Sequence, residues 1–158
     1  MSPAAALPHP PDGALAGLDP GRGKCGLVRT DPACRLVLEA CVLPPAECLA
    51  RIQLWRRQGV IQAVVMGDGT GSREWRRQLE GELPLHLIDE RHSTLEARSR
   101  FWRLEPPRGW RRCLPEGLRQ PPRDWDDVVA QVLLERWLGH PLQRRPTLAQ
   151  KDARTMKA

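Results

Sequence analysis

Residues 14–43 read ALAGLDPGRGKCGLVRTDPACRLVLEACVL, and this stretch decides the fold. It contains three apolar runs of strand length, at 14–19, 25–30 and 35–43, with turns between them. The first run ends in an Asp-Pro-Gly turn signal, and Pro44 and Pro45 stop the third. Three short strands this close together predict an antiparallel meander.

The rest of the chain alternates between helical and strand patterns. Cys48, Ile52 and Trp55 recur at helical spacing, and the nearly continuous apolar run VIQAVVM is typical of a strand covered on both faces. In order, the sequence predicts a helix over 46–59, a strand over 60–66, a turn over 67–72, a helix over 73–81, a strand over 84–90, a helix over 93–103, an irregular loop over 104–124 and a helix over 126–138. This order implies an α/β fold with a mixed five-stranded sheet, three antiparallel strands plus two parallel ones, flanked by helices.

Length and composition limit the class of protein. The 158 residues fit one domain, which we assign to 14–140, between a disordered leader (1–13) and a flexible tail (141–158). No stretch reaches the about 20 apolar residues that span a bilayer, and the start has no secretory signal pattern. The five Cys are an odd number without zinc-site spacing, which indicates free thiols. We therefore expect a cytoplasmic protein with no membrane partner.

The net charge of +6 points to a polyanionic partner, although a chain rich in Arg can also reflect codon bias. Arg and Trp alternate in and around the predicted loop, which suits single-stranded or distorted nucleic acid. The alternative is that Trp102 and Trp125 pack in the core while the Arg residues form a solvated face. The side chains concerned are Trp102, Trp110, Trp125, Arg103, Arg108, Arg111, Arg112, Arg119 and Arg123.

Three carboxylates, Asp19, Glu90 and Asp126, fall at the ends of two predicted strands and at the start of the last helix. Asp126 shares a helical face with apolar residues, whereas Asp127 points away from that face. The apolar residues of this face are Val129, Ala130, Leu133 and Trp137. A carboxylate that faces a core needs a partner, and Mg²⁺ is one such partner. Two ions about 4 Å apart can activate a water and stabilise a leaving oxygen in phosphodiester hydrolysis.

Each acid also has a purely structural interpretation. Asp19 precedes Pro-Gly as many turn residues do, Glu90 could pair with Arg91, and Asp126 suits the positive end of a helix dipole. It is their joint placement that predicts a metal site.

Three blocks of this sequence resemble the YqgF-type family of RNase H-like proteins. These blocks are ALAGLDPGRGKCGLVRTD, LIDERHSTLEARSRFW and WDDVVAQVLLERWL, and they occur in the family's order over most of residues 14–138. The family is described both as pre-16S rRNA-processing nucleases and as Holliday junction resolvases. The resemblance implies an RNase H-like fold and catalytic acids at Asp19, Glu90 and Asp126 that bind Mg²⁺ or Mn²⁺, two ions in all.

The resemblance also implies a nucleic-acid partner, RNA or branched DNA, and links the protein to ribosomal precursor particles. It further implies that Lys24 and Arg91 contact phosphate or orient the acids. The residues expected to bind nucleic acid are Lys24, Arg91, Arg22, Arg111 and Arg112. The preferred function is nucleolytic processing of the pre-16S rRNA 5′ end, with Holliday junction resolution second, by a monomer or a homodimer.

Two departures from the family keep a third function open, a nucleic-acid-binding module without turnover. MGDGTGS stands where typical members have Gly-x-Pro, and its Gly67, Gly69 and Gly71 suit either a phosphate-binding loop or a plain turn. The loop at 104–124 is longer and richer in Arg and Trp than usual, and it resembles the cyanobacterial branch.

Overall fold

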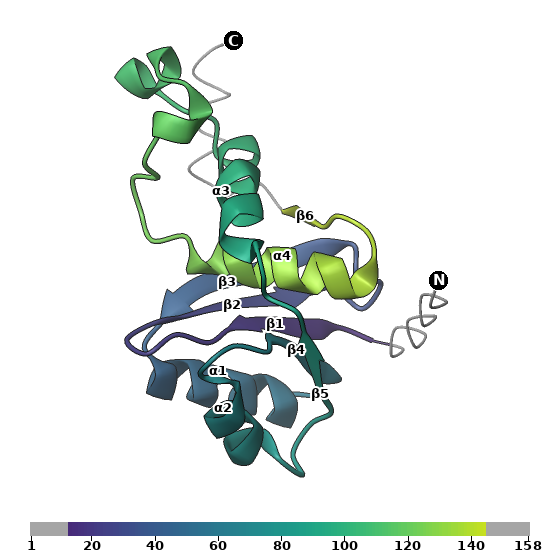
Figure 1. The fold of residues 1–158 in the computed structure, drawn as a ribbon. Helices are drawn as coiled ribbons and strands as arrows, with labels where there is room; N and C mark the ends of the chain where they lie inside the picture. The colour runs from purple at the N-terminus through teal and green to yellow at the C-terminus, as the bar shows by residue number, and fades with distance from the viewer. Residues whose placement is uncertain (1–12, 145–158) are drawn as a thin grey trace, which may run out of the picture.

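A computed structural model describes residues 13–144. The elements follow the chain in this order: β1 (Leu15–Asp19), β2 (Cys25–Thr30), β3 (Leu36–Leu43), α1 (Pro45–Arg57), β4 (Ala63–Gly67), α2 (Ser72–Leu79), β5 (Leu85–Ile88), α3 (Ser93–Leu104), the 3₁₀ turns η1 (Gly109–Cys113) and η2 (Glu116–Leu118), α4 (Asp126–Leu138) and β6 (Gln143–Arg144). The strands form one sheet in the order β5-β4-β1-β2-β3-β6 (Figure 1).

The sheet is mixed, as the sequence predicts. The strands β1, β2 and β3 pair antiparallel, while β4 lies parallel to β1 and β5 lies parallel to β4. The two parallel strands are each reached through a helix, which is the connection that parallel pairing requires. The predicted α/β architecture, a meander followed by two parallel strands between helices, is confirmed.

The sheet differs from the predicted five strands by the addition of β6. Gln143 and Arg144 pair parallel with the start of β3, and Leu142 beside them is fully buried. Residues 141–144 were expected in the flexible tail but belong to the fold, because a buried Leu and a strand pairing hold them. The rest of that tail, 145–158, and leader residues 1–12 lie outside the described residues. No helix in the described part of the chain is long and apolar enough to cross a membrane.

Helices cover both faces of the sheet (Figure 1). Because side chains alternate along a strand, Ala16 and Leu18 of β1 pack with α1 and α2, whereas Leu15 packs with α4. The predicted stripe of α1, which is Cys48, Ile52 and Trp55, is buried in the first of these cores. The central strands are thus covered twice, as the unbroken apolar run of β4 predicts.

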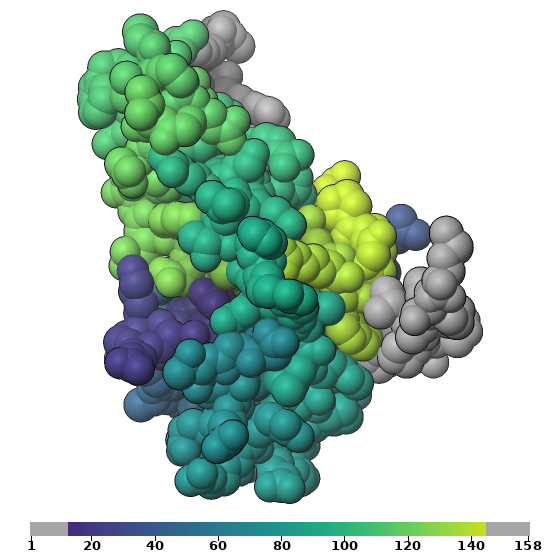
Figure 2. Space-filling view, viewed as in Figure 1, coloured from purple at the N-terminus to yellow at the C-terminus, as the bar shows by residue number. Residues whose placement is uncertain are grey.

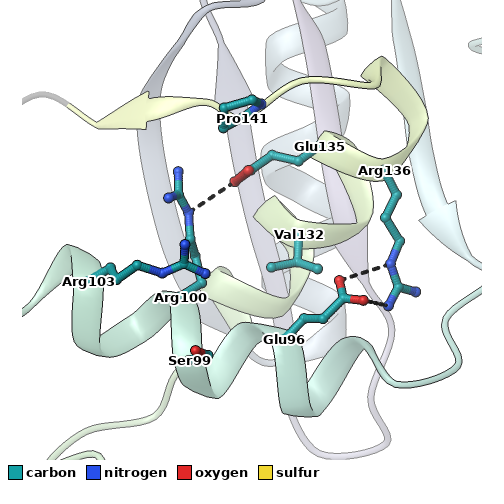
Figure 3. A pocket seen from close by; sticks show the side chains of 8 residues that line it. All are labelled: Glu96, Ser99, Arg100, Arg103, Val132, Glu135, Arg136 and Pro141. Carbon is teal, nitrogen blue, oxygen red and sulfur yellow. Dashed lines mark hydrogen bonds and ion pairs between the residues drawn. The ribbon is translucent and has the colours of Figure 1, made fainter.

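The helices α3 and α4 pack on each other through a third apolar cluster that includes Phe101 and Val132. A pocket of about 490 Å³ lies along this contact (Figure 3). Four of its charged side chains pair across it, Arg136 with Glu96 at 2.8 Å and Arg100 with Glu135 at 3.4 Å. The ion pairs in this pocket therefore link α3 to α4.

Candidate acidic site

Asp19 ends β1 on the face of the sheet that α4 covers. Residues 15, 17 and 19 share one face of the strand, and Leu15 packs with Ala130 and Leu134 of α4. Gly17 lies directly under the helix, because a Cβ there would be 2.8 Å from the Ala130 carbonyl oxygen. The Asp19 side chain therefore leaves the sheet on the side of the helix that carries Asp126.

A glycine on β2 leaves space for the start of α4 beside Asp19. Gly26 is the residue paired with Asp19 across the antiparallel β1–β2 ladder. A Cβ on Gly26 would overlap the carbonyl oxygen of Asp126, so the helix backbone rests directly on the strand at this point. This contact brings the first residue of α4 next to the end of β1.

On the other side of Asp19, two glycines leave space for the Glu90 side chain. β4 lies between β1 and β5, so the Glu90 side chain, which follows β5, has to pass over the end of β4. A Cβ on Gly67 would be 2.5 Å from Glu90 Oε2, and a Cβ on Gly69 would overlap Oε1. The glycines therefore seat the Glu90 carboxylate over β4, on the path toward Asp19.

Backbone hydrogen bonds fix the turn that delivers Glu90. The Glu90 amide donates to Asp68 Oδ1 at 3.2 Å, and the Asp68 amide donates to the Ile88 carbonyl at 3.0 Å. The Ser93 amide closes the turn on the Glu90 carbonyl at 3.0 Å. His92 in this turn has φ 62, a left-handed conformation that is unfavourable for residues other than glycine. The position of Glu90 is thus held by neighbouring turns at the ends of β4 and β5.

The three acids interact electrostatically. Burial, and then the charges of Asp126, Glu90 and Cys25, raise the pKa of Asp19 to about 7. Lys24 compensates part of this charge: its Nζ lies 2.8 Å from Asp124 Oδ1 and 3.3 Å from Asp126 Oδ2. The hydrogen bond to Asp124 and the charge of Asp126 raise the pKa of Lys24.

Asp127, the neighbour of Asp126, is buried, although the sequence predicts that it points away from the apolar face. Its carboxylate accepts hydrogen bonds from Arg123 Nη1 and Arg144 Nη1, each at 2.9 Å. Burial acts to raise the pKa of Asp127, but the hydrogen bond from Arg123 and the charges of both arginines outweigh it and lower the pKa. The reason is that α4 is covered on more than one side, by the sheet and also by α3 and the segment that leads to β6. Asp127 is therefore a structural ion-pair partner.

The other residues predicted to bind nucleic acid lie in three different parts of the fold. Arg22 is exposed in the β1–β2 turn that also carries Lys24. Arg91 is 84% exposed and pairs with Asp89 at 2.8 Å, so it does not orient the three acids. Arg111 and Arg112 belong to η1, beyond the end of α3. Lys24 and Arg22 are thus the cations of this set nearest to Asp19 along the chain.

The donor set suits a hard divalent cation, since it consists of carboxylate oxygens, and burial together with the charges of Asp126 and Glu90 raises the pKa of Asp19 to about 7. Within residues 13–144, however, no three acidic, thiol or imidazole side chains form a ready-made metal cage. Lys24 beside Asp126 accounts for part of the charge balance.

Sequence reasoning missed the roles of Gly26, Gly67 and Gly69. For Gly67 and Gly69 the sequence indicates only a phosphate-binding loop or a plain turn. The available signal was the alternation of the strands: Gly26 lies between two residues of the α1 face, Cys25 and Leu27, and therefore faces α4.

The known proteins that this chain is similar to are solved structures. No protein-family model matches the chain, and no curated protein matches it. A Thermus thermophilus RuvC in complex with a Holliday junction substrate has a TM-score of 0.45 and 18% identity, covering 80% of this chain and 94% of that one. A second Thermus thermophilus RuvC structure has a TM-score of 0.43 and 16% identity, covering 80% and 96%. A ROK hexokinase from the same organism has a TM-score of 0.36 and 19% identity, covering 56% and 38%. Since these TM-scores are below 0.5, they define neither a substrate nor a reaction for this chain.

Proposed function

We propose that this chain is a divalent-metal-dependent nuclease of the YqgF type that hydrolyses phosphodiester bonds. The observation that carries the proposal is the seating of two acids on either side of Asp19: Asp126 through Gly26, and Glu90 through Gly67. Burying Asp19 beside two other acids raises its pKa and does not stabilise the fold at neutral pH, so the cluster is best explained by a cation that binds there.

Asp19, Glu90 and Asp126 are the proposed ligands of two Mg²⁺ or Mn²⁺ ions, and such ions supply an activated water and stabilise the leaving oxygen. Lys24 is the proposed phosphate contact, because its ammonium group already lies beside Asp126. When a cation neutralises the acids, the ammonium group would leave the Asp126 carboxylate and bind a phosphate of the substrate instead. Arg22 in the same exposed turn is proposed to bind the neighbouring phosphate.

The proposed substrate is the 5′ region of pre-16S rRNA, bound free or within a ribosomal precursor particle in the cytoplasm. Support comes from the block LIDERHSTLEARSRFW and its resemblance to the YqgF-type family. A Holliday junction is the alternative substrate. It requires a homodimer with two active sites, whereas a monomer is sufficient to cut a single strand.

A non-catalytic nucleic-acid-binding module is the second candidate function. Two observations favour it: the Lys24–Asp126 ion pair, and the absence of a ready-made metal cage among residues 13–144. In that case the Lys24 ammonium group would be the permanent counter-charge of the acids.

Cleavage of two labelled substrates, a pre-16S leader RNA and a four-way DNA junction, distinguishes these functions. Wild type is incubated with Mg²⁺ or Mn²⁺ beside Asp19→Asn and a control, Asp89→Asn, which removes an exposed acid next to Glu90. We expect metal-dependent cutting of the RNA by wild type and the control, and a loss of at least about 100-fold in Asp19→Asn. Cutting of the junction alone indicates a resolvase, and binding without cutting indicates the second candidate.

A further inference from the structure

Residues 105–123 form an arm that projects beyond the end of α3 and returns to the start of α4 (Figure 1). In the space-filling view the tip of the arm is a lobe that stands clear of the sheet layers (Figure 2). Arg123 closes its base by donating from Nε to Glu105 Oε1 at 3.0 Å and from Nη1 to Asp127 at 2.9 Å. The arm therefore ends three residues before Asp126.

Arginine side chains hold the tip of the arm in one shape. Arg98 of α3 donates to the carbonyl oxygens of Gly117 and Arg119, at 2.9 and 2.7 Å. Arg119 donates to the carbonyl oxygens of Arg111 and Leu114, at 3.0 and 2.9 Å, and its guanidinium group lies over Trp102. These bonds satisfy backbone acceptors without a core, so the tip is preorganised although little of it is buried.

The surface that this tip presents is aromatic and cationic. Trp110 is 67% exposed, and the Arg111 guanidinium carbon lies 5.0 Å from the centre of its ring. Arg108 and Arg112 flank this pair, are exposed, and have no ion-pair partner among residues 13–144. An exposed Trp contributes little to folding because most of its surface stays in water, and this Trp lies among exposed arginines on a fixed support, a combination that suits recognition of nucleic acid.

We propose that Trp110 and Arg111 form a stacking platform for an unpaired base, with Arg108 and Arg112 on the adjacent phosphates. The proposal deepens the proposed function and rests on it: the substrate would carry single-stranded nucleotides next to the segment that reaches the acids. An indole face accepts any base, and the flanking cations match the strand's phosphates. A protein-binding surface of this size would instead be expected to have a contiguous apolar centre with few charges.

Fluorescence anisotropy of full-length protein tests the platform in EDTA, where no cleavage occurs. The probes are a labelled single strand and a blunt duplex of the same length. The variants are Trp110→Ala, Trp110→Phe and, as a control, Leu118→Ala, which removes an equally exposed apolar side chain of the same arm. We expect Trp110→Ala to weaken binding of the single strand about 10-fold or more and binding of the duplex less than twofold. Trp110→Phe and Leu118→Ala should each stay within about threefold of wild type.

Three results would overturn the platform: equal weakening of single strand and duplex by Trp110→Ala, no weakening of either, or no binding by wild type. A further one would be self-association of wild type that both Trp110→Ala and Leu118→Ala abolish, because the arm would then bind a second copy. Failure of the nuclease proposal gives a different result, namely Trp110-dependent binding without cleavage when Mg²⁺ or Mn²⁺ is added.

Discussion

Asp19 is the central residue of the proposed site, because its pKa is raised and no cationic side chain among residues 13–144 forms an ion pair with it. Burial and the charges of Asp126 and Glu90 raise its pKa from 3.8 to about 7 in the folded chain. Between these two values the folded state binds a proton that the unfolded state releases. This contribution to stability is therefore complete below about pH 4 and is lost as the pH rises through about 7.

The metal-free protein should show directly that stability is lost as the pH rises through about 7. In EDTA, the melting temperature of Asp19→Asn should rise relative to that of wild type as the pH increases from 5 to 8, because the amide cannot ionise. Thermal melting at several pH values, with both proteins in the same buffers, measures the difference. A difference that is independent of pH would mean that Asp19 titrates normally and is not crowded by the other acids.

At the scale of elements, the turn between β4 and α2 sets the position of a side chain that belongs to another strand. Gly67 and Gly69 have no side chain where Glu90 lies, and Asp68 binds the Glu90 amide. This arrangement explains why a turn rich in glycine follows β4 without any need for a phosphate beside it.

Gly69→Ala tests whether this turn holds the Glu90 carboxylate in place. Its new Cβ would overlap Glu90 Oε1, so the carboxylate must move, and we expect Mn²⁺ affinity to fall about 10-fold or more with little change in melting temperature. The matched control is Gly23→Ala in the β1–β2 turn, where a Cβ meets nothing within 4 Å. Calorimetric titration of both variants provides the measurement. Equal affinities for Gly69→Ala and Gly23→Ala would show that Glu90 is not held by this turn.

The helix α4 shows what helical periodicity can predict from the sequence and what it cannot. Its predicted stripe is buried, and Asp126 begins the helix at the expected residue. The burial of Asp127 could not be predicted from that stripe, because it depends on Arg123 and Arg144, which reach the helix from the arm and from β6. A helical pattern describes one face, whereas the partners on the other faces come from the tertiary fold.

At the scale of the whole molecule, the first five strands of the sheet are predictable because each of them has a local signal. The turn after Asp19 and the apolar run of β4 are such signals. What it could not supply are contacts between segments far apart, such as Gly26 under Asp126 or the short pairing of β6 with β3. The same limit applies to the arm, whose shape depends on Arg98 of α3 as well as on its own Arg119.

We propose above all that three acids, from β1, the end of β5 and the start of α4, bind a divalent cation together. Titration of Mn²⁺ into metal-free protein at pH 8, followed by calorimetry, tests it most directly. We predict saturable binding by wild type and by Asp89→Asn, at least about 10-fold weaker binding by Glu90→Gln and Asp126→Asn, and none by Asp19→Asn. Absence of binding by wild type, or equal binding by wild type and Asp19→Asn, would contradict the claim.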